Sequence, residues 1–502
     1  MRGARPARAS RPAERTGERV VIVGAGIAGL CCARLLAERF DEVLVLDRDD
    51  LPDEAVWRRQ VPQGQHQHLL LAAGVQLLER WFPGLVEELR ARGAVEIDLS
   101  RDFYWYRNGG VWRSPPSSIR APSMSRPLLE AAIRRRVAAL PNVVVRDHTP
   151  VGGLEVDAAA GRVRGVRLAG DDHIPCDLVV DATGRQARSL RWLEDLGYEP
   201  PPSSVVQVDI RYVTQVYERR DHPTRDWKAA FVIGDPDTRR MAAAVPFEGD
   251  RWYVLLGGVN GEAAPTEPAA ALAYARSFES PVVADVMESS PPIGEPTIFR
   301  FPSNRRHHLE RLRRFPLGWV PVGDAVCTFN PLYGQGMTCA AQQAQALADQ
   351  LDRTRTINRS FARRYFRAVR RVVADPWRIA VGGDFAYDGT SGPKPAGTDL
   401  MNRYMRRVAI AAQRDATVAT RIREVATLVR RPGSLLAPTL AWRVLRSGAR
   451  GPTGATTLEA SDPPTVAREG RFFTVRGLTN ARSPIWVRSP GRLLRRRGRP
   501  SR

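Results

Sequence analysis

The feature that most constrains the fold is a run of glycines directly behind a short apolar strand. Residues 20–23 read VVIV, and residues 24–29 continue as GAGIAG. Residues 30–40 are rich in helix formers, and EVLVL at 42–46 has the composition of a second strand. Strand, glycine turn, helix and strand in this order predict one βαβ unit that begins at Arg19. The expected start of the fold is therefore a parallel sheet with helices packed on it.

The three glycines of this turn have the G-x-G-x-x-G spacing of dinucleotide-binding turns. Gly24 permits the tight turn, Gly26 lets the backbone approach a pyrophosphate, and Gly29 lets the helix pack close to the strand. Phosphates then meet free N–H groups at the positive end of the helix. Asp47, at the end of the second strand, stands where an acid accepts hydrogen bonds from an adenosine ribose. Taken alone, the glycines also fit a plain turn in another α/β protein.

Further elements of the first sheet are expected up to about residue 180. The spacing predicts a helix over 125–140, with Ser125 as its N-cap and Pro127 in its first turn. Strands that return to the first sheet are expected at 143–145, 163–168 and 177–180.

The pattern then changes to strand-like segments separated by turn residues. These segments lie at 205–216, 229–234, 241–247 and 252–257. They predict an antiparallel sheet inserted into the first domain. The βα pattern resumes at Trp319, and an Ala-rich helix is expected from Thr338 to Leu351.

Positive charge dominates the composition, and much of it lies at the two ends. The 502 residues carry a net charge of +22, and every basic residue except Lys228 and Lys394 is arginine. Residues 1–19 contribute a net +4 and residues 480–502 a net +8. No zinc-finger spacing, RNP-like strand or heptad accompanies these arginines, so nucleic-acid binding is not expected. A basic amphipathic segment near 434–446 leaves peripheral membrane contact open.

The cysteines and the apolar runs indicate the compartment. Five cysteines form no C-x-x-C pair, and an odd number cannot close a complete disulfide framework. We therefore expect buried free thiols rather than a thiol redox centre. No apolar run approaches the roughly 18 residues of a membrane-spanning helix, and the arginine-rich start lacks a signal-peptide core. A cytoplasmic protein is the expectation.

Two further motifs give the glycine turn a specific context. Residues 176–185 read CDLVVDATGR, a strand that ends in a polar turn, and residues 323–325 read GDA shortly before NPLYGQGMT at 330–338. In this order and spacing the three motifs resemble the FAD fingerprints of the class A flavoprotein monooxygenases. That family includes aromatic hydroxylases and squalene epoxidase. The resemblance covers residues 19–352.

The resemblance implies ten FAD contacts. Those for the pyrophosphate, the adenosine ribose and the connecting chain are Gly24, Gly26, Gly29, Asp47 and Arg126. Those for the ribityl chain and the isoalloxazine ring are Asp324, Pro331, Gly334, Gly336 and Met337. The N-terminus of the following helix is expected to stabilise negative charge on the N1 and C2 carbonyl edge of reduced flavin.

Details of the motifs narrow the resemblance. The DATGR turn at 181–185 is similar to that of epoxidases, geranylgeranyl reductases and flavin halogenases, so a nicotinamide-binding role does not carry over directly to Asp181. The segment VPQGQHQHLL at 61–70 resembles bacterial polyether epoxidases, together with residues 330–338, DPW at 375–377 and DFAY at 384–387. Tryptophan halogenases carry a W-x-W-x-I-P motif and a catalytic lysine. Trp105 lacks that context, and a chain with two lysines disfavours halogenation.

Catalytic residues are not assigned, because no triad or carboxylate pair stands out. Arg58 and His66 are the candidates: Arg58 pairs with cofactor charge or is an exposed basic residue, and His66 touches flavin or substrate or is structural. His66 and His68 share a face but lack a third ligand, so no metal site is expected. The aromatic cluster at 103–106 with Trp112 reads as a hairpin that lines an apolar substrate pocket or fills a core.

The expected fold class is α/β, a Rossmann-like FAD-binding domain with an inserted antiparallel β-sheet substrate domain and a C-terminal helical extension. The parts are a disordered leader (1–18), the FAD-binding domain (19–94, 120–202 and 296–352), the sheet domain (95–119 and 203–295), the helical extension (353–450) and a basic, partly disordered tail (451–502).

The expected function is that of an FAD-dependent monooxygenase. NAD(P)H reduces the flavin, O2 forms a C4a-hydroperoxyflavin, and an apolar biosynthetic intermediate receives one oxygen as an epoxide or hydroxyl. The alternative enzyme is an FAD-dependent reductase or dehydrogenase of the geranylgeranyl reductase type. The alternative of another class is a basic membrane-surface or nucleic-acid binding protein. The sequence does not indicate the substrate, the choice between NADH and NADPH, or the oligomeric state.

Overall fold

The computed structural model describes residues 15–59, 61–170, 172–220, 225–448 and 451–453, all within one compact unit that spans residues 1–457. Most of the predicted leader (1–18) and nearly all of the predicted basic tail (451–502) lie outside the described residues. The first strand begins at Gly17, two residues before the expected Arg19.

A parallel sheet built from the βαβ unit organises the part of the chain that is expected to bind the cofactor. Within the described ranges its strand order is β16–β10–β1–β2–β6, and every pair is parallel. The strands are β16 (Trp319–Pro321), β10 (Leu178–Asp181), β1 (Gly17–Val23), β2 (Phe40–Leu46) and β6 (Val143–Arg146). Residues 20–23 are fully or almost fully buried, as a central parallel strand requires. The predicted βαβ unit is confirmed.

Helices cover this sheet and explain one boundary that the sequence misplaced. Helix α1 (Ile27–Leu36) follows the glycine turn and packs against α8 (Gly336–Thr354), which packs in turn against α9 (Arg359–Asp384). Phe40 was expected at the end of the first helix. It is instead the first residue of β2, where it is fully buried and pairs with Gly17.

The capped helix predicted at 125–140 is confirmed as α4 (Arg126–Ala138), which packs on α1. Ser125 is its N-cap, and the Ser125 hydroxyl accepts a hydrogen bond from the Leu128 N–H at 3.2 Å. Two further helices nearby are α2 (Ala72–Trp81) and α3 (Leu85–Ala91).

The strand predicted at 163–168 forms, but it does not join the parallel sheet. It is β8 (Arg162–Leu168) in an antiparallel sheet with β7 (Val151–Asp157) and β9 (His173–Pro175). A short turn joins β7 to β8, and a parallel pair needs a crossover of a dozen or more residues. Antiparallel pairing is therefore the arrangement open to it. Helix α5 (Arg188–Asp195) packs on β7.

A second large sheet contains the four segments predicted for the insertion. It also contains residues 292–307, which cross the predicted boundary between the sheet domain and the FAD-binding domain at residue 295. Its order in the resolved part of the chain is β17–β15–β11–β14–β13–β12–β4. The strands are β17 (Cys327–Thr328), β15 (Pro292–His307), β11 (Ser203–Glu218), β14 (Arg251–Val259), β13 (Arg240–Phe247), β12 (Ala229–Ile233) and β4 (Phe103–Arg107). The sheet is not wholly antiparallel, because β4 pairs with β12 in parallel. A long connection between these two strands makes that pairing possible.

Smaller elements border this sheet. Strands β3 (Val95–Asp98) and β5 (Arg120–Ser123) flank β4 in sequence and pair with each other. Helices α6 (Pro268–Arg276) and α7 (Val282–Ser289) pack on β12, β13 and β14.

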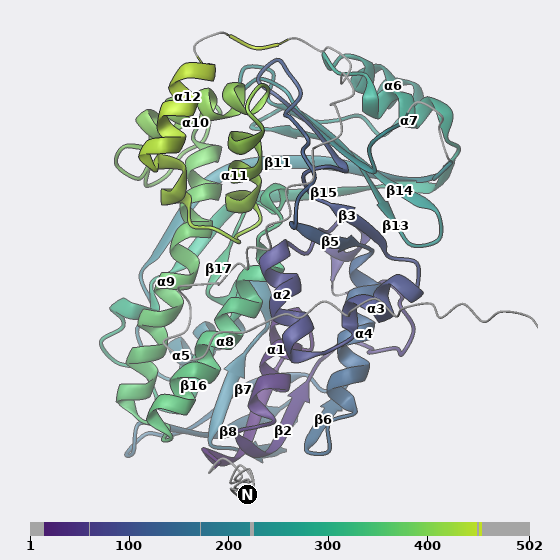
Figure 1. Cartoon of the computed structure of the whole chain (residues 1–502). Helices are drawn as coiled ribbons and strands as arrows, with labels where there is room; N and C mark the ends of the chain where they lie inside the picture. The colour runs from purple at the N-terminus through teal and green to yellow at the C-terminus, as the bar shows by residue number, and fades with distance from the viewer. Residues whose placement is uncertain (1–14, 60, 171, 221–224, 449–450, 454–502) are drawn as a thin grey trace, which may run out of the picture. The chain divides into compact units, whose positions relative to one another are not determined.

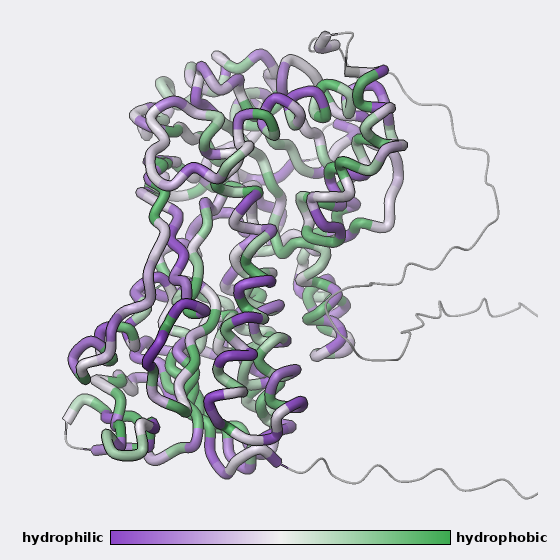
Figure 2. The backbone as a smooth tube through the Cα atoms, turned by 90° about the vertical axis from the view of Figure 1, so that its left-hand side faces the viewer, coloured by the Kyte–Doolittle hydropathy of each residue, from purple (hydrophilic) through white to green (hydrophobic). Residues whose placement is uncertain are grey.

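The C-terminal extension is helical, as predicted. Helices α10 (Thr398–Ala412), α11 (Ala416–Ala426) and α12 (Pro438–Gly448) follow α9 and contact one another. Figure 1 shows these three helices gathered on one side of the large sheet. In Figure 2 hydrophobic and hydrophilic stretches alternate along most helices, as expected for helices that bury one face. No helix among the described residues is long and apolar enough to cross a membrane.

Candidate active site

A cavity of about 2380 Å³ connects the parallel sheet to the large sheet and the C-terminal helices. At one end it is lined by residues that follow the carboxyl ends of β1, β2, β10 and β16, namely Gly26, Arg48, Ala182 and Asp324. Ligands of open α/β sheets bind at this edge. The large sheet contributes apolar and aromatic lining residues, among them Tyr212, Phe231, Met241, Leu255 and Phe299. One continuous space therefore joins a polar end to an apolar end.

Seven of the ten residues expected to contact FAD line this cavity. They are Gly26, Arg126, Asp324, Pro331, Gly334, Gly336 and Met337. The other three, Gly24, Gly29 and Asp47, do not line it and instead shape the turn that does.

The glycine turn has the geometry that an anion-binding turn needs. Gly24 has φ 109°, and a Cβ there would lie 2.5 Å from the carbonyl oxygen of Ala182. A Cβ on Gly29 would overlap the carbonyl oxygen of Gly24. Gly26, by contrast, has nothing within 4 Å of its Cβ position, and no side chain caps the helix that begins after it. The open space thus lies where a helix N-terminus presents unpaired N–H groups.

Asp47 and Arg58 belong to a buried ion network beside this turn. Asp47 Oδ2 accepts a hydrogen bond from Ala25 N–H at 2.6 Å, and Arg58 Nη1 lies 3.8 Å from the same oxygen. Arg58 Nη2 donates to Glu130 at 3.0 Å, and Arg126 Nε donates to the other Glu130 oxygen at 2.8 Å. Burial alone raises the pKa of Glu130, but Arg126 and Arg58 outweigh it and hold that pKa below its usual value.

This network defines the burial and the partners of Arg58. Its residue exposure is 7%, so the alternative of an exposed basic residue is wrong. Arg58 pairs with carboxylates and does not line the cavity, so its position is that of a residue that supports Asp47 and Arg126 rather than one that touches reacting atoms.

At the far side of the polar end, the chain leaves buried polar atoms without partners. Both side-chain amide atoms of Gln335 and the hydroxyl of Thr338 are buried and unpaired. Thr338 does not line the cavity, and its hydroxyl lies beside Gly74 of α2. Gln335 does line it, and because buried groups of this kind are normally hydrogen-bonded, its amide fits a ligand that carries both donors and acceptors. Asp324 is enclosed by the fold yet exposed to the cavity. Burial raises the pKa of Asp324, and the charges of Arg126 and Arg185 oppose the rise. The residues present therefore fit FAD along the whole predicted path.

The loop at 330–333 is fixed by a buried carboxylate that the sequence left without a role. Asp384, at the end of α9, accepts hydrogen bonds from Asn304 Nδ2 at 2.6 Å and from Asn330 Nδ2 at 2.7 Å. Asn330 Oδ1 accepts from Leu332 N–H at 3.0 Å. Burial raises the pKa of Asp384 to about 7, against the effect of these hydrogen bonds. Three segments far apart in the sequence thus meet beside the predicted flavin position.

Of the two histidines, His68 lines the cavity and the candidate His66 does not. His66, the catalytic candidate, is buried outside the cavity, where Nδ1 lies 2.9 Å from Thr214 Oγ1 and the ring packs on Tyr212 and Phe299. His68 lines the cavity, and its Nδ1 donates to the His66 carbonyl at 2.9 Å. Because that nitrogen carries the proton, Nε2 of neutral His68 is an acceptor. Burial lowers the pKa of His68 to about 3, and Arg126 adds to the effect.

The aromatic cluster divides between the two alternatives. Trp105 and Trp112 stack with ring centroids 5.0 Å apart, and both line the cavity. Phe103 lines it as well and also belongs to the core of the large sheet. Tyr104 and Tyr106 instead bond to Ser280 and Glu279 at the start of α7. The cluster forms the expected tight hairpin, with Tyr106 bridged to Val111.

The cysteines are free thiols, as predicted. Cys31, Cys32, Cys327 and Cys339 are buried and Cys176 is partly exposed. Burial raises the pKa of Cys31, Cys176 and Cys339 to about 12, so these thiols stay protonated and unreactive.

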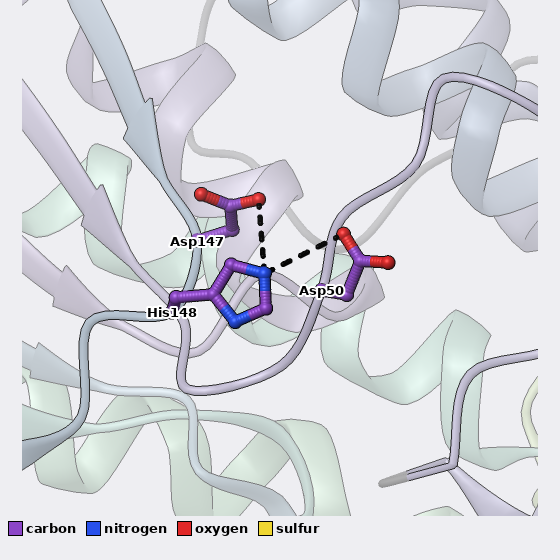
Figure 3. A group of neighbouring side chains, drawn as sticks. All are labelled: Asp50, Asp147 and His148. Carbon is purple, nitrogen blue, oxygen red and sulfur yellow. Dashed lines mark ion pairs between the residues drawn. The ribbon is translucent and has the colours of Figure 1, made fainter.

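A group with the composition of a metal site lies on the surface. His148 Nε2 is 3.8 Å from Asp50 and 3.9 Å from Asp147, in the loops that follow β2 and β6 (Figure 3). All three side chains are exposed, and the distances are those of surface ion pairs. The predicted pair His66 and His68 gains no third metal ligand among the described residues.

Comparisons with known proteins agree with this geometry. A family model described as "FAD dependent oxidoreductase" matches residues 19–110. Protein Rv3254 of Mycobacterium tuberculosis is 31% identical over 396 residues, which cover 75% of this chain and 82% of the relative. Glycine oxidase of Pseudomonas putida is 25% identical over 225 residues, 38% of this chain and 60% of that enzyme.

Solved structures show the same fold at low sequence identity. The flavin-dependent brominase Bmp2 has a TM-score of 0.60 at 16% identity, covering 86% of this chain and 99% of that chain. PqsL, a probable FAD-dependent monooxygenase from Pseudomonas aeruginosa, has a TM-score of 0.53 at 20% identity, covering 74% and 99%. These likenesses establish a Rossmann-like FAD-binding fold with additional sheets and C-terminal helices. By its similarity to the mycobacterial protein over most of both chains, this protein belongs to the family of Protein Rv3254, and it is an FAD-dependent oxidoreductase.

Proposed function

We propose that the protein is a monooxygenase that uses NAD(P)H and O2 to insert one oxygen atom into a bulky apolar substrate. The observation that carries this proposal is the single cavity that joins the FAD residues to an aromatic and aliphatic wall. A typical small-molecule pocket measures roughly 300 to 1,000 Å³. The space here, about 2380 Å³, is large enough for a dinucleotide cofactor and a second large ligand beside it.

When bound, FAD supplies the redox chemistry, and the chain supplies its setting. Gly26 and the start of α1 would hold the diphosphate, and Arg126 and Asp324 would hold the chain that connects it to the ring. The N-terminus of α8, with Gln335 just before it, would lie next to the ring and would stabilise negative charge there. The walls from the large sheet exclude water from the space where the substrate lies.

Halogenation is the second candidate, because the flavin-dependent brominase Bmp2 and the flavin-dependent halogenase CmlS share the fold. Lysine is absent from the described residues that line the cavity. Lys228 pairs with Asp102 and Lys394 with Asp399 instead. This favours oxygen transfer to the substrate over a halogenase that acts through a lysine.

The reductase alternative uses the same cavity and differs only in that O2 is not a substrate.

The proposal also includes a cytoplasmic location. It further includes a division of the chain into cofactor, sheet and helical parts at the boundaries predicted from the sequence. Exposed Leu436, Trp442 and Leu445 beside arginines of α12 are what supports peripheral membrane contact. Membership of an oxidoreductase family argues against the alternative of a basic binding protein.

Isotope labelling separates the three chemistries. The purified yellow protein is reduced anaerobically with NADPH, and in parallel with NADH, and then receives 18O2, bromide and a lipophilic polyene. An 18O-labelled epoxide or alcohol supports the proposal. A product with fewer double bonds and no label assigns a reductase, and a brominated product assigns a halogenase. A reduced flavin that does not react with O2 would overturn the proposal.

A further inference from the structure

Buried N–H donors without acceptors gather in one part of the cavity wall. Trp105 and Trp112 come from the β4 hairpin, Arg423 comes from α11, and all three line the cavity. The indole N–H groups of both tryptophans, and Nε and Nη2 of Arg423, are buried and have no hydrogen-bond partner. The three side chains are neighbours: the two indoles stack, and the Arg423 guanidinium lies 5.6 Å from the Trp112 ring.

Arg423 is the unusual member of this donor cluster, defined as Trp105, Trp112 and Arg423. Its exposure is 1%, and it lies beside Trp112, which belongs to a hydrophobic cluster with Val408, Ile422 and Leu435. Nη1 donates to the carbonyls of Arg113 and Ala419, which leaves the other two nitrogens free. A buried guanidinium is costly unless it is paired.

No carboxylate of the described chain fills this gap. Arg423 makes no ion pair within 4.0 Å in the ranges that the structure describes, and Asp98 is the acid whose charge reaches it. The oxygens of Asp98 are already occupied, since they accept hydrogen bonds from the backbone of Ser100, Arg101 and Ser117 and from the Ser117 hydroxyl. Burial lowers the pKa of Arg423 to about 10, which leaves it cationic at neutral pH.

We propose that the donor cluster binds an anionic oxygen group of the substrate, a carboxylate in the first instance, at the end of an otherwise apolar molecule. The cluster offers donors and no acceptors, which selects for a group that only accepts. A carboxylate is also the partner whose planar geometry fits the guanidinium fork. The proposal rests on the proposed function, because it concerns the same cavity, and it names the substrate class as a lipophilic acid.

The test compares a lipophilic acid with its uncharged ester. Binding of 1-pyrenebutyrate and of its methyl ester to the FAD-loaded, oxidised protein is measured by equilibrium dialysis, with no reductant present. The wild type is expected to bind the acid about tenfold or more tightly than the ester. In Arg423→Met the preference for the acid is expected to vanish while ester binding persists. Trp112→Phe keeps the ring, loses the N–H, and is expected to weaken acid binding by about threefold.

Arg421→Met is the matched control on the same helix. Arg421 pairs with Glu424 at 2.9 Å and does not line the cavity, so this variant should keep the preference of the wild type. Equal binding of acid and ester by the wild type, binding of neither probe, or an unchanged preference in Arg423→Met would each overturn the proposal. Binding is measured without turnover, so a protein that prefers the acid and never incorporates 18O would refute the monooxygenase function and leave the donor cluster standing.

Discussion

The two ends of the cavity are built by different means. At the cofactor end the shape comes from backbone turns close in sequence, such as the glycine turn, where two of the three glycines have no room for a Cβ. At the substrate end the wall is assembled from side chains of β4, β12, β13, β15 and α11. The first construction tolerates almost no change of shape, whereas the second changes by degrees as side chains are exchanged.

The glycine turn gives the strongest test of the difference between the two ends. Gly29→Ala forces a Cβ onto the carbonyl of Gly24, and we expect the free energy of unfolding to fall by about 3 kcal/mol or more, even without FAD. A Cβ at Gly26 meets nothing within 4 Å, so Gly26→Leu should fold normally and lose FAD. Thermal unfolding and flavin content of the two purified variants test this. A Gly26→Leu protein with full flavin content would contradict the cofactor geometry.

Asp384 lies where the two ends meet, and its effect should depend on pH. Its folded pKa of about 7 lies above the ordinary value of 3.8, so the folded state holds the proton more tightly than the unfolded chain. The stability from this group is fully present below pH 3.8 and is lost as pH rises through 7, with about 3 kcal/mol of the loss between pH 5 and pH 8. Between pH 5 and 8, Asp384→Asn should unfold with a flatter pH dependence than the wild type. The exposed Asp388→Asn is the control and should keep the slope of the wild type.

The same contrast explains which parts of the fold and the site could be predicted from the sequence. The βαβ unit, the cap at Ser125 and the residues around Asp324 follow from patterns within a few residues, and seven of ten predicted cofactor contacts line one cavity. The prediction that β8 joins the parallel sheet was wrong, because the composition of a strand does not determine its partner. The short turn after β7 was the signal that decides it.

Apart from the aromatic cluster at 103–106 with Trp112, the substrate end was not predicted, since its contacts join residues far apart in the sequence. Asn304, Asn330 and Asp384 come from three elements, and no local pattern marks them as partners. Arg423 is one of 74 arginines, and only its burial distinguishes it. His66 and His68 would share a face on a strand, but residues 66–68 form no strand, and His68 alone of the two lines the cavity.

His66, which packs on Tyr212 and Phe299 near the substrate end, should affect stability in a pH-dependent way. Burial lowers the pKa of His66 to about 4, so the folded state disfavours the protonated ring. The stability from neutral His66 is fully present above pH 6.5 and is lost as pH falls toward 4. Relative to His66→Leu, the wild type should lose about 2 kcal/mol of unfolding free energy between pH 7 and pH 5, measured by denaturant titration. His173 is exposed, so His173→Leu is the control and should keep the pH dependence of the wild type. If His66→Leu lost as much unfolding free energy between pH 7 and pH 5 as His173→Leu, His66 would not be the group responsible.

The smallest expected effect belongs to Arg126, and it asks how much of the cofactor end depends on side chains at all. Arg126→Gln leaves Glu130 with Arg58 as a partner, so the network loses one charge without being left unpaired. We expect FAD to bind about tenfold more weakly, measured by flavin fluorescence on refilling the apoprotein. Arg135→Gln on the same helix, where Arg135 pairs with Glu88, should leave FAD affinity unchanged. A loss as complete as that of Gly26→Leu would show that side-chain charge, and not the backbone turn, governs cofactor binding, and the distinction between the two ends would then fail.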